Sequence, residues 1–324
     1  MRKKILRISW IVGILIFVFL IYKIGLDRIW EYIKKLSWQK FLILFFLRFL
    51  YYVFRTMSWK IIFEKYERRL PFVHLLAARI AGDAISYLTP SAQLGGEPIR
   101  AMMVRSSNKR KSLASVIVDK TIEVLVMIFF IIIAVSIAVT RIPMPEEYKF
   151  IFIAFVVGAI AFALFLLFKQ REGFFVWIIN ALRKIKIKFK FIERNMDKIR
   201  EIDLHISSFY KNHRNIFLIV FLLHSLIFIF WTGEIYFALL FIGAPGTTYL
   251  NSFLILTLGG IIILLPTVPA VLGIYEMTYV TIFILLGLGA DAGITLTLIR
   301  RILLLTWAGI GLLAIFKQQV RHKS

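Results

Sequence analysis

The sequence predicts an all-α, polytopic membrane protein with about eight transmembrane helices and a re-entrant segment. Of its 324 residues, 60% are hydrophobic and 15% are aromatic, which exceeds the usual content of a soluble domain. The charged residues, 18% of the chain, gather between long apolar runs. Those runs are close to the length of about 20 residues that carries a helix across the hydrocarbon layer. We therefore expect residues 1–324 to form a single integral membrane domain.

Eight apolar runs follow this pattern. The first comes after Arg2, Lys3, Lys4 and Arg7, and no small-residue cleavage site follows it, so we interpret it as a signal anchor. The runs are 8–22, 41–62, 113–140, 150–168, 216–242, 250–265, 272–289 and 296–316.

The basic residues predict the orientation. The presumed inner segments hold 28 Lys and Arg and the presumed outer loops hold 7, which predicts a cytoplasmic membrane protein with both termini in the cytoplasm. The formal net charge of +23 then reflects topology and contact with anionic lipid rather than binding of nucleic acid. Segment 169–214 is basic and amphipathic, and is either a linker on the cytoplasmic membrane surface or a dock for anionic lipids.

Cofactor chemistry has little support in the sequence. The chain has no cysteine, its five histidines lack the spacing of a metal-binding helix, and no Gly-rich phosphate loop opens a helix after a strand. We expect neither a metal nor another cofactor, and the sequence does not predict an oligomeric state.

A first irregularity lies at 72–100. Residues 72–88 are apolar but contain Arg79 and Asp83, and a full crossing here would break the charge bias. A re-entrant segment that dips in from the inner side preserves that bias. The chain then reads TPSAQLGGEPIR, in which proline interrupts a helix and glycine permits a tight turn or close backbone approach. The relevant residues are Pro90, Gly95, Gly96, Glu97 and Arg100, and the last two, spaced i and i+3, would pair if the helix resumes.

A second irregularity lies at 265–277, where Pro269, Gly273 and Glu276 follow an apolar run. Both breaks share a Pro-x6-Glu spacing. Broken hydrophobic segments in the two halves of a membrane protein indicate a transporter site between inverted repeats, here between 7–168 and 215–324. The alternative for each break is a kinked helix or a surface turn.

Charged residues also occur within the predicted spans. Asp119 and Glu123 share one helix face, with Lys120 close by, and intramembrane charges usually face a cavity or pair with one another. They are either functional residues or a structural ion pair. Arg300, Arg301 and Glu234 are further candidates, with Arg300 expected near the outer interface. His224 is expected to be a buried histidine with a satisfied hydrogen bond.

The segments ISYLTPSAQLGGEPIRAMMV, SVIVDKTIEVLV and LPTVPAVLGIYE, with an arginine in the last span, resemble the lysylphosphatidylglycerol synthase transmembrane region family. The resemblance covers nearly the whole chain. Two departures are Lys120, where the family tends to have arginine, and the late motif, where Ala270, Val271 and Leu272 stand in a region usually richer in glycine.

The resemblance implies a flippase-like region that moves a charged lipid between leaflets. In two-part members of the family, a soluble acyltransferase domain adds the aminoacyl group, and this sequence shows no such domain. We therefore expect translocation of a lipid or lipid-linked sugar, such as an anionic phospholipid or a polyprenyl-phosphate-linked substrate. The alternatives are a membrane-embedded transferase, with Glu97 or Asp119 as general base, and a scaffold for a separate synthase.

Overall fold

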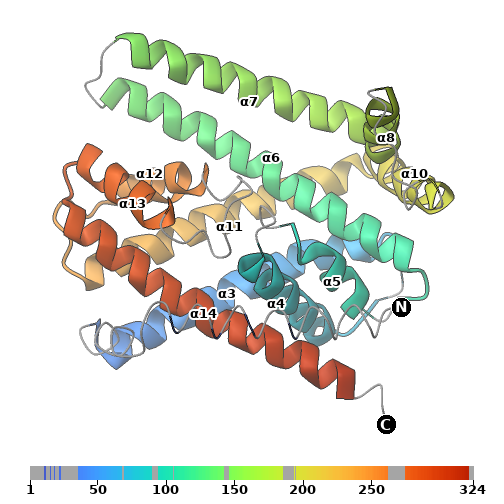
Figure 1. Cartoon of the computed structure of the whole chain (residues 1–324), viewed down its shortest axis with the longest axis horizontal. Helices are drawn as coiled ribbons and strands as arrows, with labels where there is room; N and C mark the ends of the chain where they lie inside the picture. The colour runs from blue at the N-terminus through green and yellow to red at the C-terminus, as the bar shows by residue number, and fades with distance from the viewer. Residues whose placement is uncertain are drawn as a thin grey trace.

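The computed structural model describes residues 36–320 except 68, 90–93, 105, 142–145, 185–192, 194 and 262–273, and also describes residues 11, 15, 18 and 22. The predicted span 8–22 and most of the basic run in 169–214 that follows Lys184 lie outside the described residues. The described residues form eleven helices and contain no strand, which confirms the all-α prediction (Figure 1). The helices are α3 (Trp38–Phe63), α4 (Phe72–Leu88), α5 (Glu97–Met103), α6 (Lys109–Arg141), α7 (Glu146–Glu172), α8 (Phe174–Lys184), α10 (Met196–Asn212), α11 (Arg214–Phe241), α12 (Tyr249–Ile261), α13 (Ile274–Leu285) and α14 (Ala290–Val320).

Five of the described helices are long and apolar enough to cross a membrane, namely α3, α6, α7, α11 and α14. The chain is therefore a multi-pass membrane protein. The predicted spans 250–265 and 272–289 correspond to the shorter helices α12 and α13, of 13 and 12 residues. At 1.5 Å per residue each of them extends about 20 Å, less than the hydrocarbon thickness of about 30 Å.

Long-range contacts define two ends of the helix bundle. At one end, which we call the basic end, Tyr66 Oη donates to the carbonyl of His205 at 3.1 Å and Arg110 pairs with Glu201 at 2.5 Å. At the opposite end, Lys40 Nζ donates to the carbonyl of Phe241 at 3.1 Å. Helices α3 and α11 therefore run in opposite directions beside each other, as their packing also shows.

Helices α4 and α5 form a hairpin, called here the first hairpin, that begins and ends at the basic end. The Glu67 carboxylate, just before α4, accepts hydrogen bonds from the backbone N–H groups of Ser107 at 3.3 Å and Asn108 at 3.0 Å, just after α5. The segment thus folds back to the end at which it starts, as the prediction of a re-entrant segment required.

Helices α12 and α13 flank residues 262–273 and form the second hairpin, at the opposite end. A Cβ added at Gly246, before α12, would lie 2.8 Å from Leu288 Cδ2, after α13, so the two feet of this hairpin are neighbours. The order helix, hairpin, helix therefore occurs twice, as α3, first hairpin, α6 and as α11, second hairpin, α14. The two units run in opposite directions, which is the arrangement of an inverted repeat (Figure 1).

Glycines permit the closest contacts of the first hairpin. A Cβ at Gly96 would overlap the carbonyl of Gly82, and the Gly96 N–H donates to Ser86 Oγ at 3.0 Å. On the other side of α4, a Cβ at Gly311 of α14 would lie 2.6 Å from the Ile80 carbonyl oxygen. The first hairpin is therefore held against the last helix of the other repeat by backbone approaches that only glycine allows.

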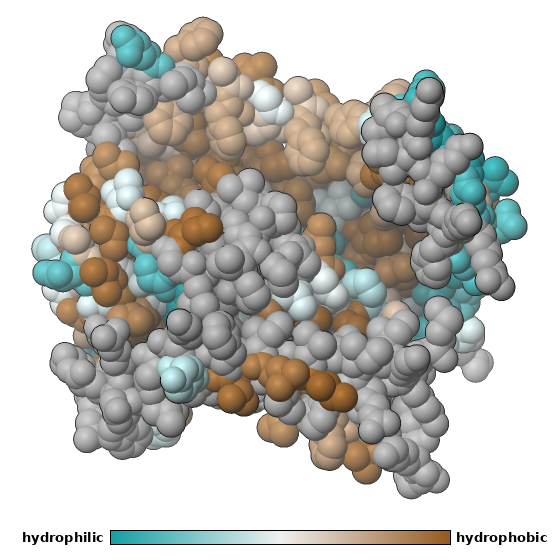
Figure 2. Space-filling model, viewed as in Figure 1, coloured by the Kyte–Doolittle hydropathy of each residue, from teal (hydrophilic) through white to brown (hydrophobic). Residues whose placement is uncertain are grey.

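Helix α7 stands apart from the repeats. None of the most apolar window of α7 is buried, and hydrophobic side chains including Val157 and Phe168 are exposed, as expected of a face in contact with lipid (Figure 2). At the basic end, Asp203 of α10 accepts hydrogen bonds from the N–H groups of Phe175 and Val176 at the start of α8, at 3.2 and 2.7 Å. Burial raises the pKa of the Asp203 carboxyl. This cap fixes α8 against α10 beneath α7.

Candidate functional site

A cavity of about 1270 Å³ lies between the two repeats and helices α7 and α8. Its wall on α7 and α8 is almost entirely apolar and includes Ala159, Phe162 and Ile178. Charged residues form its wall on the side of the two repeats. They are Arg48, Arg55, Asp83, Glu97, Lys120, Glu123, Arg300 and Arg301. The cavity is therefore amphipathic, with a charged side and an apolar side.

Behind the charged wall lies a buried cluster that we call the arginine clasp, formed by Arg79, Arg100, Asp119 and His224. Asp119 Oδ2 accepts hydrogen bonds from Arg79 at 2.7 Å and Arg100 at 2.8 Å, and His224 Nε2 lies 3.2 Å from Asp119 Oδ1. Both guanidinium groups also lie over the ring of Trp59, at 5.5 and 4.3 Å. These contacts join α4, α5, α6 and α11, and no residue of the clasp lines the cavity.

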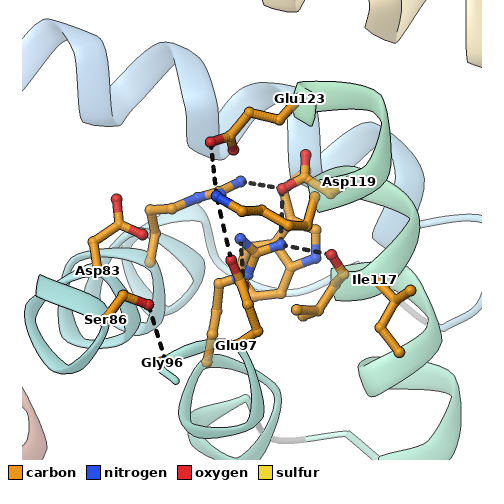
Figure 3. A network of polar contacts seen from close by, with 12 residues as sticks. Asp83, Ser86, Gly96, Glu97, Ile117, Asp119 and Glu123 are labelled. Carbon is orange, nitrogen blue, oxygen red and sulfur yellow. Dashed lines mark hydrogen bonds and ion pairs between the residues drawn. The ribbon is translucent and has the colours of Figure 1, made fainter. Parts of the chain in front are cut away.

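A second group of charges, from α3 to α6, faces the cavity. Arg55 bridges two carboxylates, because one of its nitrogens binds Asp83 and another lies 2.5 Å from Glu123. Lys120 lies 3.0 Å from Glu123 and 4.0 Å from Glu97. Figure 3 shows Asp83, Glu97 and Glu123, from three different helices, gathered around the nitrogens of these cations. The charges are therefore mutually neutralised, yet they border open space.

The second repeat, together with Arg48 of α3, contributes a different arrangement. Arg48 pairs with Glu234 at 2.5 Å, and Arg301 Nε donates to Glu276 at 2.9 Å. Arg300 donates a hydrogen bond to the hydroxyl of Tyr279 instead. Its guanidinium lies 5.4 Å from the Tyr279 ring centre. Trp231 and Tyr275 also line the cavity here, so this part of its wall is aromatic as well as charged.

The structure divides the residues that the sequence predicted. Asp83, Glu97, Lys120, Glu123 and Arg300 line the cavity, whereas Arg79, Arg100 and Asp119 form the clasp behind it. The expected pair of Glu97 and Arg100 is confirmed, at 3.1 Å. Gly95 and Gly96 form the turn before α5, and Glu276 is the partner of Arg301. The predicted residues Pro90, Pro269 and Gly273 lie outside the described residues.

The structure also gives the position of Arg300 along its helix and the hydrogen-bonding partner of His224. Arg300 lies ten residues into α14, because this helix begins at Ala290, earlier than the predicted start at 296, and its side chain is 3% exposed. The polar first turns of this helix had been assigned to an outer loop. His224 is buried with a hydrogen-bonding partner, as predicted, and that partner is Asp119.

Arg48 and Arg55 are cavity residues that sequence reasoning missed. They lie in α3, within the predicted span 41–62, and their spacing of seven residues places both on one face of the helix. Two arginines at this spacing inside an apolar span are themselves a signal, because intramembrane charges are costly and usually face a cavity or pair with one another. Trp231, Tyr275 and Tyr279 gave no signal, since aromatic residues are common throughout this chain.

The fold and this cavity define a class, that of polytopic helical membrane proteins with a charged cavity between two inverted repeats. The chain belongs to the lysylphosphatidylglycerol synthase TM region family, whose sequence profile matches residues 6–312. This confirms the resemblance that the sequence motifs indicated.

The relatives carry general names. The chain is 22% identical to the UPF0104 membrane protein PH1989 of Pyrococcus horikoshii over 322 residues, which cover 93% of this chain and 92% of that protein. A UPF0104 membrane protein of Methanothermobacter thermautotrophicus is 27% identical over 128 residues, or 39% of this chain and 38% of the relative. No solved structure matches the chain.

Proposed function

We propose that this protein translocates a lipid or lipid-linked sugar across the cell membrane, with both of its termini in the cytoplasm. The observation that carries the proposal is the amphipathic cavity of about 1270 Å³ between the two repeats. A lipid has the same division into a charged headgroup and apolar chains. The family supports the same class of substrate, because its description names the synthase of a phospholipid.

The charged wall suits a polar headgroup. Asp83 and Glu123 keep 20% and 25% of their side chains exposed while both bind Arg55. A charge at membrane depth is costly, so such groups usually face a cavity or pair with one another. A headgroup in the cavity contacts both cations and carboxylates. These contacts replace the hydrogen bonds to water that the headgroup loses. The lipid chains lie along the apolar surface of α7 and α8.

The two hairpins support an alternating mechanism. One hairpin opens toward the basic end and the other toward the opposite end, and discontinuous helices of this kind line the midplane sites of transporters with inverted repeats. A shift of population between two states, each open at one end, moves a headgroup without carrying a bare charge through hydrocarbon. Movement runs down a gradient or uses a coupled ion.

The test is leaflet exchange in liposomes that contain the purified full-length protein. Fluorescent anionic, aminoacylated and polyprenyl-phosphate lipids are supplied in turn, and a membrane-impermeant quencher reports how fast each reaches the outer leaflet. Ala159→Trp fills the apolar side of the cavity, and Val157→Trp adds the same ring to the exposed face of α7. We expect the first variant to slow exchange of at least one lipid by tenfold or more, and the second to exchange at the native rate.

Two outcomes would overturn the proposal. Exchange at the rate of empty liposomes for every lipid excludes translocation, and a new lipid product on addition of donor substrates then assigns the protein to the membrane transferases. Equal rates in the native protein and the Ala159→Trp variant would show that exchange does not pass through this cavity.

A further inference from the structure

We infer that Arg300, with Trp231 and Tyr275, forms an anion subsite that holds the phosphodiester group of the substrate lipid. The inference rests on the proposed function and adds a substrate class to it. Arg300 is 3% exposed, lies in α14 and lines the cavity. Among the described residues, its hydrogen bond goes to the Tyr279 hydroxyl, and no carboxylate forms an ion pair with it, although Glu234, the partner of Arg48, attracts it from farther away.

The other charges inside the protein neutralise one another. Within the described residues, each remaining buried arginine and Lys120 has a carboxylate partner. These pairs are Arg48 with Glu234, Arg55 with Asp83 and Glu123, Lys120 with Glu123 and Glu97, Arg79 with Asp119, Arg100 with Asp119 and Glu97, and Arg301 with Glu276. Seven of the described cations, Arg300 included, therefore face six carboxylates. The excess positive charge lies at Arg300, because Glu234, the carboxylate that attracts it, forms its ion pair with Arg48.

The aromatic surroundings do not replace a counter-ion. The Arg300 guanidinium lies 5.7 Å from the Trp231 ring, 5.8 Å from Tyr275 and 5.4 Å from Tyr279. Cation–π contacts stabilise a guanidinium by less free energy than its removal from water costs. The free-energy cost of burying the Arg300 guanidinium is therefore offset only when an anion binds beside it.

Hydrogen-bond donors without partners gather at the same place. Arg300 Nε and Trp231 Nε1 are buried, have no hydrogen-bond partner in the described part of the chain, and belong to residues that line the cavity. The Tyr275 hydroxyl, which lies beside Tyr279, adds a third donor from a residue that lines the cavity. Unsatisfied buried donors are costly and usually indicate an absent partner. A phosphate offers several acceptor oxygens, and guanidinium binds two of them side by side. The donors and the positive charge therefore match one phosphate group.

The charge balance selects among phosphates. A phosphodiester carries a single negative charge and neutralises the excess positive charge, whereas a monoester carries nearly two at neutral pH. A zwitterionic headgroup also carries a cation. The carboxylates of the cavity already pair with arginine or lysine and therefore bind this added cation weakly. A soluble phosphodiester has the same charge and the same acceptor oxygens. It has no apolar chains, however, that would contact the apolar surface of α7 and α8 in the cavity. The inferred substrate is thus a lipid with one phosphodiester and no headgroup cation.

The test is a binding measurement on the full-length protein in detergent micelles, which does not depend on transport. The probes are short-chain phosphatidylglycerol, short-chain phosphatidylcholine and the water-soluble glycerophosphoglycerol. We expect Arg300→Gln to weaken binding of phosphatidylglycerol at least tenfold, and Arg300→Lys to weaken it less because the charge remains. Tyr275→Phe removes one donor while keeping the ring, and is expected to weaken binding about threefold. Arg200→Gln, which removes an exposed charge on α10, is the matched control and should bind like the native protein.

Three results would overturn the inference. Unchanged phosphatidylglycerol binding in both Arg300→Gln and Tyr275→Phe excludes the subsite, and two variants are used because one of them could fail to fold. Equal affinity for phosphatidylcholine excludes the charge selection. Equal affinity for glycerophosphoglycerol excludes a lipid as the ligand. If binding depends on Arg300 while liposomes show no exchange, the subsite stands and the proposed translocation fails.

Discussion

The two hairpins occupy corresponding places in an inverted repeat but are stabilised differently. Asp119 lies ten residues after Lys109, the first residue of α6, and Arg300 lies ten residues after Ala290, the first residue of α14. The next residue in each helix, Lys120 or Arg301, faces the glutamate of its own hairpin, Glu97 or Glu276. The pairing is therefore repeated, but the preceding position carries opposite charges in the two halves.

This difference separates a fixed hairpin from a hairpin beside a ligand site. In the first half the carboxylate of Asp119 is completely buried and neutralises two arginines of the hairpin. In the second half the guanidinium of Arg300 meets aromatic rings and cavity space. The two repeats thus share a backbone arrangement but differ in the charge at one position. In the first half this residue, Asp119, holds the hairpin in place, and in the second half Arg300 is available to bind a ligand. The following variants test that distinction, from the largest expected effect to the smallest.

Asp119→Asn should destabilise the protein most. The change leaves Arg79 without a carboxylate and Arg100 with Glu97 alone, and breaking a buried ion pair costs about 3–5 kcal/mol. Glu276→Gln is the counterpart in the second half. Because the Glu276 side chain is 27% exposed while Arg301 is 2% exposed, we expect a smaller loss, of about 1–3 kcal/mol. Thermal unfolding of both variants in the same detergent measures the difference, and equal shifts in melting temperature would refute the distinction.

Gly96→Ala should also act on stability, whereas Gly259→Ala should act mainly on binding. A Cβ at Gly96 meets the backbone of Gly82, which cannot move alone, so we expect a loss of about 1–3 kcal/mol. A Cβ at Gly259 lies 2.6 Å from the end of the Tyr279 ring, which shifts more easily but then disturbs the hydrogen bond from Arg300.

Gly233→Ala, in α11, has nothing near the added Cβ and does not line the cavity, so it is the matched control. Melting temperature and phosphatidylglycerol affinity are measured for all three alanine variants. Loss of affinity in Gly96→Ala at unchanged stability, or the reverse in Gly259→Ala, would reverse the roles assigned to the two hairpins.

Acid should loosen the feet of the first hairpin only. Burial raises the pKa of Glu67, but hydrogen bonds from Ser107 and Asn108 outweigh it and leave the pKa below its ordinary value of 4.5. A carboxyl with a lowered folded-state pKa stabilises the fold above its ordinary pKa, and this contribution is lost as the pH falls through the lowered value. The hydrogen bonds involved contribute about 1 kcal/mol.

Hydrogen exchange, corrected for intrinsic rates, tests this prediction. We expect the amide of Asn108 to lose protection several-fold between pH 6 and strongly acidic pH, and residues 286–289 to keep theirs. Glu67→Gln should show the weaker protection at both pH values. A pH dependence that persists in this variant would assign the effect to another group.

Much of the fold follows from the sequence. The apolar runs predicted the long helices, because crossing a bilayer requires about 20 apolar residues in one helix. The sequence TPSAQLGGEPIR predicted the first hairpin, since proline ends a helix and glycine permits the close approach seen at Gly96. Helix lengths were less predictable, because polar residues such as Asp291 begin α14 although hydropathy excludes them from a span.

The candidate site followed less completely. Charges within the predicted spans marked Asp119, Lys120, Glu123 and Arg300 as exceptional residues, because such charges are costly in hydrocarbon. Their separate roles depend on contacts between distant positions, such as Arg79 with Asp119, 40 residues apart, and Arg48 with Glu234, 186 residues apart. The spacing of residues within one segment does not predict contacts between residues so far apart in the sequence.

The sequence by itself thus determined that the chain is a multi-pass membrane protein of one family, interrupted by a broken segment in each half and carrying charges within its spans. Only the tertiary structure decided which charges are neutralised and which remain beside open space. The physical reason is that hydrophobicity is a property of each segment, whereas neutralisation is a property of pairs. Among the described residues, Arg300 differs from the other six cations in having no ion pair with a carboxylate.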